Sequence, residues 1–505
     1  MRVTDALTTQ EGPVIAWREL ARRIEGLSGR VAIRWHVDPR FGYGLAETKI
    51  ASDRGVPTAS DGVTTVAVRS WSTAGSDVRA LSGRFELEQG SRALIALVAA
   101  HDEPLPVPER DEIERRIDLT CEYWRRWASL CRYDGGWRPA VLRSALTLKL
   151  LTSSPSGAIA AAPTTSLPEA IGGEANWDYR YSWVRDASYT LDALLRLDLR
   201  EEAHRSFTWL LEASAADAPN LKVLYPIDEA APRKEDQLPL AGYRGSRPVR
   251  IGNAAAEQFQ LGIYGDFIDT ASLYVREGNT LDPATAERIA ATADRVCKVW
   301  KKKDAGLWEE RNRTRHFTES KISSRVALDR AVALAEAGEL PREHMQRWRR
   351  EAERITDYVE RKCWSDELGA FAAYAGSKEL DAAVLLAWRM GYGDPRSARM
   401  ASTLTAIRRE LARGPLLYRR SGAEATEGAF LACSFWLVEA LARSGRVEEA
   451  AALMDELVEL ANDVGLYSEQ IDPDSRELLG NFPQGLTHLG LIMAACIVEE
   501  SQGER

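Results

Sequence analysis

The sequence predicts a mainly α-helical protein, in which a partial antiparallel β-sandwich precedes an (α/α)6 barrel of helix hairpins. Apolar residues alternate with polar ones in the first part of the chain, and recur with helical spacing over the rest. One helix-turn-helix segment also recurs within the helical part. The length of 505 residues exceeds what a single hydrophobic core usually serves, so two domains are expected.

Residues 1–105 are predicted to form the β-sandwich. In the segment RVAIRWHV, the side chains of Val31, Ile33, Trp35 and Val37 share one face of a strand. Gly, Ser and Asp turns separate the other candidate strands, which are MRVTDAL, VTTVAVRSW, GRFELEQ and RALIALVAA. Because the first candidate strand has no residues leading into it, we expect the sandwich to be incomplete and to leave sheet edges uncovered.

Residues 106–135 are predicted to be a helical linker. The Pro-rich run EPLPVPE marks the boundary, and the segment from Glu112 to Ser129 follows it with apolar residues at helical spacing. Residues 136–505 are then assigned to the barrel domain, which would carry the catalytic site. These boundaries divide the chain into three parts.

The recurring segment supports a barrel of paired helices. LDALLRLDLREEA (191–203) aligns without gaps on VEALARSGRVEEA (438–450), and each reads as the end of one helix, a turn and the start of the next. The barrel region has room for about twelve helices with their connecting loops. Six such pairs closed into a ring give an (α/α)6 barrel with a ligand site at one end.

Composition excludes several classes of partner. The formal net charge is -9 and no long basic run is present, which argues against nucleic acid as a partner. No stretch approaches 18 consecutive apolar residues, and the start MRVTDALTTQEG does not read as a secretory signal. We therefore expect a cytoplasmic protein without a membrane span. The six cysteines are far apart, so neither a metal site nor a disulfide framework is expected.

The segment GGEANWDYRYSWVRDASYTL suggests a carbohydrate site. It brings four aromatic residues and four charged ones into ten positions, directly before an amphipathic helix. Aromatic faces and hydrogen-bonding charges suit the faces and hydroxyls of a sugar. The alternative is an aromatic-rich start of a helix that packs in a core.

Two further segments place carboxylates beside aromatic residues. They are DAGLWEER (304–311) and DVGLYSEQIDPD (463–474). A pair of carboxylates is the equipment for glycoside hydrolysis, in which one protonates the leaving oxygen and the other activates water. A neighbouring Trp can desolvate one of the pair and keep it protonated. With 75 acidic residues in the chain, most loop carboxylates are simply solvated, so this pattern alone is weak.

Longer motifs that contain these segments indicate a resemblance to a known family. The chain resembles glycoside hydrolase family 15, the glucoamylase and trehalase-like inverting α-glucosidases, over nearly the whole helical region. The similarity lies in APTTSLPEAIGGEANWDYRYSWVRDAS, GYRGSRPVRIGNAAAEQFQLGIYGD, GLWEERNRTRHFTESKI, TEGAFLACSFWLVEAL and LYSEQIDPDSRELLGNFPQGLTHLGLI. Several long motifs in the same order make the resemblance specific.

The resemblance implies the two catalytic residues. Glu309, after Trp308 in the GLWE motif, matches the general acid, and Glu469 in the SEQID segment matches the general base. Trp308 would help to keep Glu309 protonated, whereas Glu469 should stay ionised to accept a proton from water. In an inverting enzyme the two carboxyl groups lie roughly 6.5–9.5 Å apart, which leaves room for that water.

The resemblance also implies a set of substrate-binding residues. Arg185 and Asp186 match residues that bind hydroxyls of the terminal glucose, and their donors and acceptor suit that role. The other matches are Tyr179 near the attacking water, Trp183 in the pocket wall, Glu310 at a substrate contact, and Arg419 in the pocket, with Arg420 as the alternative. Glu319 and Arg325 stand where relatives more often have an aromatic residue, which leaves the outer pocket open.

The expected function is an exo-acting, inverting α-glucoside hydrolase. It would release β-glucose from the non-reducing end of an α-glucan, an α-linked oligosaccharide or trehalose. The chemistry implies no metal and no organic cofactor, although some trehalase-like relatives are reported to depend on phosphate and magnesium. The alternatives are an inverting glycoside phosphorylase and a glycan-binding protein without activity. The linkage preference and a homo-oligomeric assembly are left open.

Overall fold

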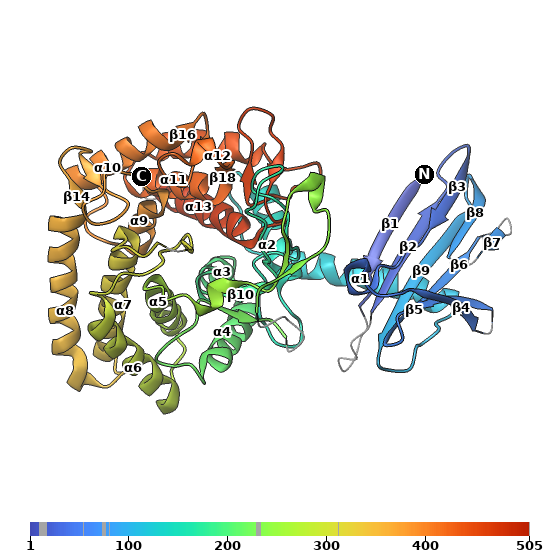
Figure 1. Cartoon of the computed structure of the whole chain (residues 1–505), viewed down its shortest axis with the longest axis horizontal. Coiled ribbons are helices and arrows are strands. Elements are labelled where there is room, and N and C mark those ends of the chain that lie inside the picture. The colour runs from blue at the N-terminus through green and yellow to red at the C-terminus, as the bar shows by residue number, and fades with distance from the viewer. Residues whose placement is uncertain are drawn as a thin grey trace. The chain divides into compact units, whose positions relative to one another are not determined.

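The computed structural model describes residues 1–9, 18–53, 55–72, 77–79, 81–228, 234–311 and 313–503 (Figure 1). The chain divides into two compact units, Met1–Leu130 and Cys131–Arg505. The finer division at residues 105 and 135 stays a prediction. Among the described residues, no helix combines the length and hydropathy needed to cross a bilayer.

The described residues of the first unit form an antiparallel β-sandwich with one α-helix. Its larger sheet has the strand order β1 (Arg2–Leu7), β2 (Glu19–Glu25), β9 (Arg92–His101), β6 (Thr64–Trp71), β5 (Val56–Ser60) and β4 (Lys49–Asp53). The smaller sheet has the order β3 (Arg30–His36), β8 (Ser82–Glu88) and β7 (Asp77–Arg79). The predicted sandwich is confirmed, although the sequence pattern did not reveal β2, β4, β5 and β7.

The central strand β9 is buried on both faces because it lies between two layers. On one face, Ile95 packs with Phe85 and Leu87 of the smaller sheet. On the other face, Leu94 packs with Ile113 of α1 (Arg110–Ala128). Alternate side chains of a strand point to opposite faces, so the nearly continuous apolar run RALIALVAA follows from this position.

The strand register agrees with the predicted face of β3, because Val31 pairs with Leu87 and Ile33 with Phe85, and both partners are buried in one core cluster. In β3, Ile33 and Trp35 are half-buried against the core as expected, but Val31 is 38% exposed. Val31 lies near one end of the smaller, three-stranded sheet.

The second unit contains twelve α-helices in its described residues, as the sequence predicted (Figure 1). They are α2 (Arg138–Leu151), α3 (Val184–Arg196), α4 (Arg200–Ser214), α5 (Gly262–Arg276), α6 (Pro283–Val299), α7 (Thr318–Glu336), α8 (Met345–Tyr358), α9 (Leu386–Met390), α10 (Ala398–Leu411), α11 (Leu431–Arg443), α12 (Val447–Val458) and α13 (Gly485–Gly503).

The odd-numbered helices of this second unit form a closed inner ring. Contacts run from α3 to α5, α7, α9, α11 and α13, and from α13 back to α3. The inner helices α3, α5, α7 and α11 also contact an outer helix that is next to them in the chain, and α13 contacts both α12 and α2. The inner helices α11 and α13 are buried over nearly their whole length, which explains why both lack a polar face. The predicted (α/α)6 barrel is therefore confirmed.

The recurring sequence segment corresponds to the same local structure twice. Helices α3 and α11 end at aligned positions, and α4 and α12 begin at aligned positions after three intervening residues. The turn between them places Asp198 and Gly445, which also align, at φ values of 60° and 81°. Asp and Gly tolerate this left-handed conformation better than most residues, so each can end one helix and reverse the chain.

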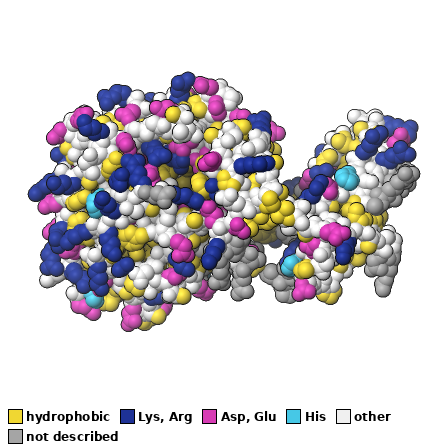
Figure 2. All heavy atoms as spheres, viewed as in Figure 1, with side chains coloured by type: hydrophobic (Ala, Val, Ile, Leu, Met, Phe, Trp, Pro, Cys, Tyr) yellow, Lys and Arg dark blue, Asp and Glu magenta, His cyan; other side chains and the backbone are white. Residues whose placement is uncertain are grey.

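Loops that lead into the inner helices converge at one end of the ring. They carry short antiparallel pairs, including β10 (Tyr181–Trp183) with β11 (Leu224–Pro226), and the ladder of β18 (Ala429–Phe430), β19 (Gln470–Ile471) and β20 (Leu478–Leu479). On the face of this unit shown in Figure 2, basic and acidic side chains are interspersed around a central hollow. These loops position the candidate site.

Candidate active site

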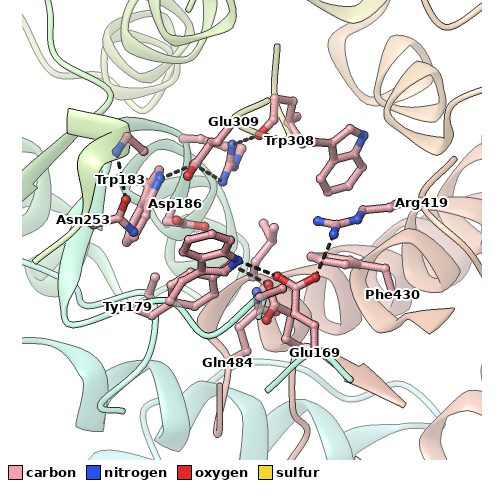
Figure 3. A pocket seen from close by; sticks show the side chains of 18 of the residues that line it. Glu169, Tyr179, Trp183, Asp186, Asn253, Trp308, Glu309, Arg419, Phe430 and Gln484 are labelled. Atoms are coloured by element: carbon pink, nitrogen blue, oxygen red, sulfur yellow. Dashed lines mark hydrogen bonds and ion pairs between the residues drawn. The ribbon is translucent and has the colours of Figure 1, made fainter. Parts of the chain in front are cut away.

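A cavity of about 320 Å³ lies where the loops before the inner helices meet. Every predicted site residue lines it: Tyr179, Trp183, Arg185, Asp186, Trp308, Glu309, Glu310, Arg419 and Glu469. Figure 3 shows several of these side chains facing one space from different loops. The barrel thus brings together residues that are up to 290 positions apart in the chain.

Glu309 sits on a tight turn at one side of the cavity. Its backbone adopts a φ of 59°, and its Oε1 accepts a 2.5 Å hydrogen bond from Trp183 Nε1. A left-handed conformation costs a non-glycine residue about 1–2 kcal/mol, and such strain often marks functional sites. Burial raises the pKa of the Glu309 carboxyl, while the charge of Arg185, 4.0 Å from Oε1, opposes this effect.

A buried carboxylate fixes the turn that carries Glu309. Asp304 Oδ2 accepts hydrogen bonds from the backbone N–H groups of Leu261 and Gly306, and from the hydroxyl of Ser320. Leu261 precedes α5, and Ser320 lies in the first turn of α7. Asp304 therefore ties the Glu309 turn to the starts of two inner helices.

Glu469 lies immediately before β19, and its carboxyl group is buried. Its Oε1 accepts a 2.6 Å hydrogen bond from the hydroxyl of Tyr179. Its Oε2 packs against Gly480, where an added Cβ would lie 2.5 Å from that oxygen. Burial and the nearby charge of Glu169 raise the pKa of Glu469 to about 8, which works against the expectation that Glu469 is ionised at neutral pH.

Tyr179 and Trp183 connect the two carboxyl groups. Their rings pack edge to face with centroids 5.3 Å apart. The Tyr179 hydroxyl donates a hydrogen bond to Glu469, and Trp183 Nε1 donates one to Glu309. The packed pair thus presents Glu469 and Glu309 to the same cavity. The expected separation of roughly 6.5–9.5 Å between the two carboxyl groups stays a prediction.

Arg185 and Asp186 lie in the first turn of α3 and line the cavity, where Asp186 is buried and Arg185 is half-buried. Arg185 Nη1 donates to the carbonyl of Leu307, 3.2 Å away. Among the described residues, Arg185 Nε and Asp186 Oδ1 have no hydrogen-bond partner. An unpaired buried polar group costs about 1–3 kcal/mol, and hydroxyl groups of a bound ligand would satisfy both atoms.

Trp308 forms part of the aromatic wall. Its Nε1 donates to Asp381, its ring stacks on Trp436 and it meets the edge of Phe430. Asp381 also accepts from the backbone of Ala383 at the start of a helical turn, so it holds the wall and the turn together.

Both candidate arginines reach the cavity, but their partners differ. Arg419 binds the carboxylate of Glu427 through two nitrogens and also donates to Glu169. Arg420 donates to Glu310 at a distance of 2.5 Å. Arg419 is therefore held in the wall by buried acids, whereas Arg420 forms a pair with the predicted substrate contact Glu310.

Glu319 and Arg325, which stand where relatives more often have an aromatic residue, do not line the cavity. Glu319 is buried in the first turn of α7, where burial raises the pKa of its carboxyl well above its ordinary value. Arg325 forms an ion pair with Asp329 one turn further along the same helix. These two differences from the family pattern therefore do not change the residues that line the cavity.

Several lining residues were not predicted from the sequence, among them Glu169, Phe430 and Gln484. Glu169 is the most notable because it is an acidic residue that is only 2% exposed. It follows Pro168 in the first of the family-like segments, and no local pattern distinguishes it from other loop glutamates. Among the described residues, no cluster of three or more His, Cys, Asp or Glu could bind a metal ion.

The chain is similar in sequence to a known family and to proteins named trehalase. A model of the family described as "Glycosyl hydrolases family 15" matches residues 137–496. A protein named "Trehalase" from Mycolicibacterium smegmatis is 36% identical over 507 residues, which cover 96% of this chain and 75% of that protein. A "Trehalase" from Thermoplasma volcanium is 32% identical over 506 residues, which cover 99% of this chain and 81% of that protein.

Solved structures share the fold at low sequence identity. A bacterial glucoamylase complexed with acarbose matches with a TM-score of 0.73 at 13% identity, over 99% of this chain and 82% of that chain. A glucoamylase from Saccharomycopsis fibuligera matches with a TM-score of 0.53 at 12% identity, over 71% of this chain and 94% of that chain.

Proposed function

Because the chain belongs to glycosyl hydrolases family 15 and is a glycosidase that hydrolyses O-glycosyl bonds, we propose that it is an inverting α,α-trehalase. In this proposal Glu309 is the general acid and Glu469 the general base. The observation that supports these roles best is the packed pair of Tyr179 and Trp183, in which Tyr179 donates a hydrogen bond to Glu469 and Trp183 donates one to Glu309.

The proposed reaction has one displacement step. Arg185 and Asp186 hold hydroxyls of one glucose, and Glu309 gives its proton to the glycosidic oxygen as the bond from that oxygen to C1 breaks. A water molecule attacks C1 from the opposite face, and Glu469 takes its proton. The anomeric carbon of that glucose therefore inverts, while the leaving glucose keeps its configuration.

Two observations favour trehalose over a long glucan. Relatives that are 32–36% identical over nearly the whole chain carry the name trehalase. The cavity volume of about 320 Å³ lies near the lower end of the range of roughly 300–1,000 Å³ for small-molecule sites. The Glu310–Arg420 pair would then contact the second glucose, because it also lines the cavity.

A proton-NMR time course tests both the substrate and the stereochemistry. Inversion of trehalose gives one α-glucose and one β-glucose per molecule at early times, whereas retention gives only α-glucose. Maltose, isomaltose and maltotetraose serve as comparison substrates under the same conditions. Preferred turnover of any of these would contradict the trehalase assignment, and glucose 1-phosphate formed in phosphate buffer would indicate a phosphorylase instead.

Replacing either glutamate tests the assigned roles. Glu309→Gln and Glu469→Gln should each lower kcat on the order of 10²–10⁴-fold, because each removes one proton transfer. Circular dichroism should show an unchanged fold. Glu353→Gln, on the exposed side of α8, is the matched control and should keep full activity. Near-normal turnover in either active-site variant would remove that residue from its role.

A further inference from the structure

We infer that Glu169 is a positioning residue that makes Glu469 a stronger base, by holding a fixed negative charge beside it. The inference rests on the proposed function, in which Glu469 takes the proton of the attacking water. Glu169 lies on the loop before β10 and lines the same cavity (Figure 3).

The hydrogen bonds of Glu169 favour its charged form. Its Oε1 accepts from Trp177 Nε1 at 2.9 Å, and its Oε2 accepts from Arg419 Nη2 and Gln470 Nε2, both at 2.7 Å. Burial raises the pKa of Glu169, but all three partners stabilise the carboxylate, and none offers an acceptor for a carboxyl O–H. The structure therefore supports an ionised Glu169.

The backbone brings Glu169 and Glu469 to the same place. The carbonyl of Pro168, next to Glu169, accepts a 2.8 Å hydrogen bond from the N–H of Gly480. Gly480 is the residue against which Glu469 Oε2 packs. Gln470, which follows Glu469 in the chain, binds Glu169 through its side chain. Two independent connections thus fix the position of one carboxylate relative to the other.

The charged groups around Glu469 leave a net negative charge. Glu169 and Glu427 repel a charged Glu469, Arg419 attracts it, and Tyr179 donates a hydrogen bond to it. Arg419 is already paired with both of the other glutamates. Its single positive charge therefore cannot compensate both, and the ionised form of Glu469 is disfavoured.

This environment has a benefit for the reaction and a cost. Burial and the charge of Glu169 raise the pKa of Glu469 to about 8. A carboxylate with a higher pKa is a better acceptor for the proton of water, because general-base strength follows pKa. The cost is that Glu469 is protonated, and so inactive, up to a higher pH. Glu169 therefore sets both the strength of the base and the acid limb of the pH–rate profile.

The pH dependence of kcat/KM in two Glu169 variants tests the inference. In Glu169→Gln the acid limb should move to lower pH by about one unit, because a like charge has been removed. The plateau of kcat/KM should fall at the same time, because the base is weaker. Glu169→Asp keeps the charge and should keep the limb near its wild-type position. An equal shift in both variants would overturn the role of the charge. An unmoved limb in Glu169→Gln would overturn either that role or Glu469 as the base, and a titration without substrate separates the two.

A measurement without substrate separates this inference from the proposed function. Protein labelled with ¹³C at the glutamate carboxyl carbons is titrated by NMR, and the Glu469 signal is identified by its loss in Glu469→Gln. The midpoint for Glu469 should fall in Glu169→Gln and stay in Glu169→Asp, with thermal unfolding showing that both variants are folded. An unmoved midpoint overturns the role of Glu169. A midpoint that moves while the kinetic limb does not overturns Glu469 as the base.

Discussion

At the scale of single residues, Gly480 determines where the Glu469 carboxyl lies. An added methyl group would stand 2.5 Å from Glu469 Oε2, and the φ of 74° is also unfavourable for alanine. Gly480→Ala should therefore displace the carboxyl and lower kcat/KM strongly. Gly338→Ala is the matched control, because its φ is 88° but nothing lies within 4 Å of the added atom.

The two glycine variants are compared by activity and by stability. Both should lose about 1–2 kcal/mol of unfolding free energy from the left-handed backbone conformation. Only Gly480→Ala should also lose activity. Equal kcat/KM in the two variants would show that the position of Glu469 tolerates the change.

The hydrogen bond from Trp183 to Glu309 should influence the alkaline limb of the activity profile. Donation from Trp183 Nε1 stabilises the ionised carboxyl and so opposes the rise in pKa that burial causes. In Trp183→Phe this stabilisation is lost, the pKa of Glu309 rises further, and the acid stays protonated to higher pH. The alkaline limb of kcat/KM should therefore move to higher pH.

A second tryptophan provides the control for this shift. Trp388 Nε1 donates to Ser444 Oγ away from the active-site cavity, so Trp388→Phe loses a similar hydrogen bond without changing the acid. Its alkaline limb should coincide with that of the wild type. A limb that moves to lower pH in Trp183→Phe would mean that the ring acts on Glu309 chiefly through packing.

The sequence predicted the residues of the cavity wall better than their interactions. Motifs placed Tyr179 and Trp183 at the site, but their separate hydrogen bonds to Glu469 and Glu309 depend on barrel closure. Glu169 carries no local pattern, and two of its partners, Arg419 and Gln470, lie 250 and 301 positions away. Such contacts between distant segments leave no periodic signal in one sequence.

At the scale of elements, helical periodicity in the sequence predicted the helices of the barrel, but strand periodicity did not predict β2. β2 turns Glu19 and Arg23 inward, where Glu19 pairs with Arg116 of α1, while Leu20 is 40% exposed. On the face of β2 that meets α1, the charged Glu19 and Arg23 flank the buried Ala21, because ion pairs with the covering helix replace apolar packing. A period-2 hydrophobic pattern cannot reveal a strand of this kind.

Helix α6 depends on a lysine from its neighbour α7. Lys321 is fully buried, and its Nζ donates to the carbonyls of Trp300 and Lys302 just beyond the end of α6. Lys321→Met would leave these carbonyls unpaired, so the unfolding free energy should fall by about 1–3 kcal/mol. Denaturant titration measures the loss.

The control for this prediction lies on α6 itself. Lys298 is exposed in the last turn of that helix, and its replacement by Met should change stability much less. Similar losses in Lys321→Met and Lys298→Met would mean that general charge effects, and not the two hydrogen bonds, stabilise the end of α6.

At the scale of the whole molecule, the cavity belongs to one of the two compact units. Its lining residues run from Ala161 to Leu486, and the inner ring closes within Cys131–Arg505. The first unit has its own sandwich core, with Ile24 and Phe85 among its buried residues. Each unit thus has what a separately stable domain needs.

Cleavage between the units tests this independence in the intact protein. A protease site inserted after Leu130, which is 55% exposed, allows the folded chain to be cut between the two units. Because the second unit holds every lining residue and a closed ring of helices, kcat/KM for trehalose should be unchanged after complete cleavage. Protein without the inserted site, treated with the same protease, is the control. A loss of activity in proportion to the cut fraction would show that the β-sandwich unit supports the active site.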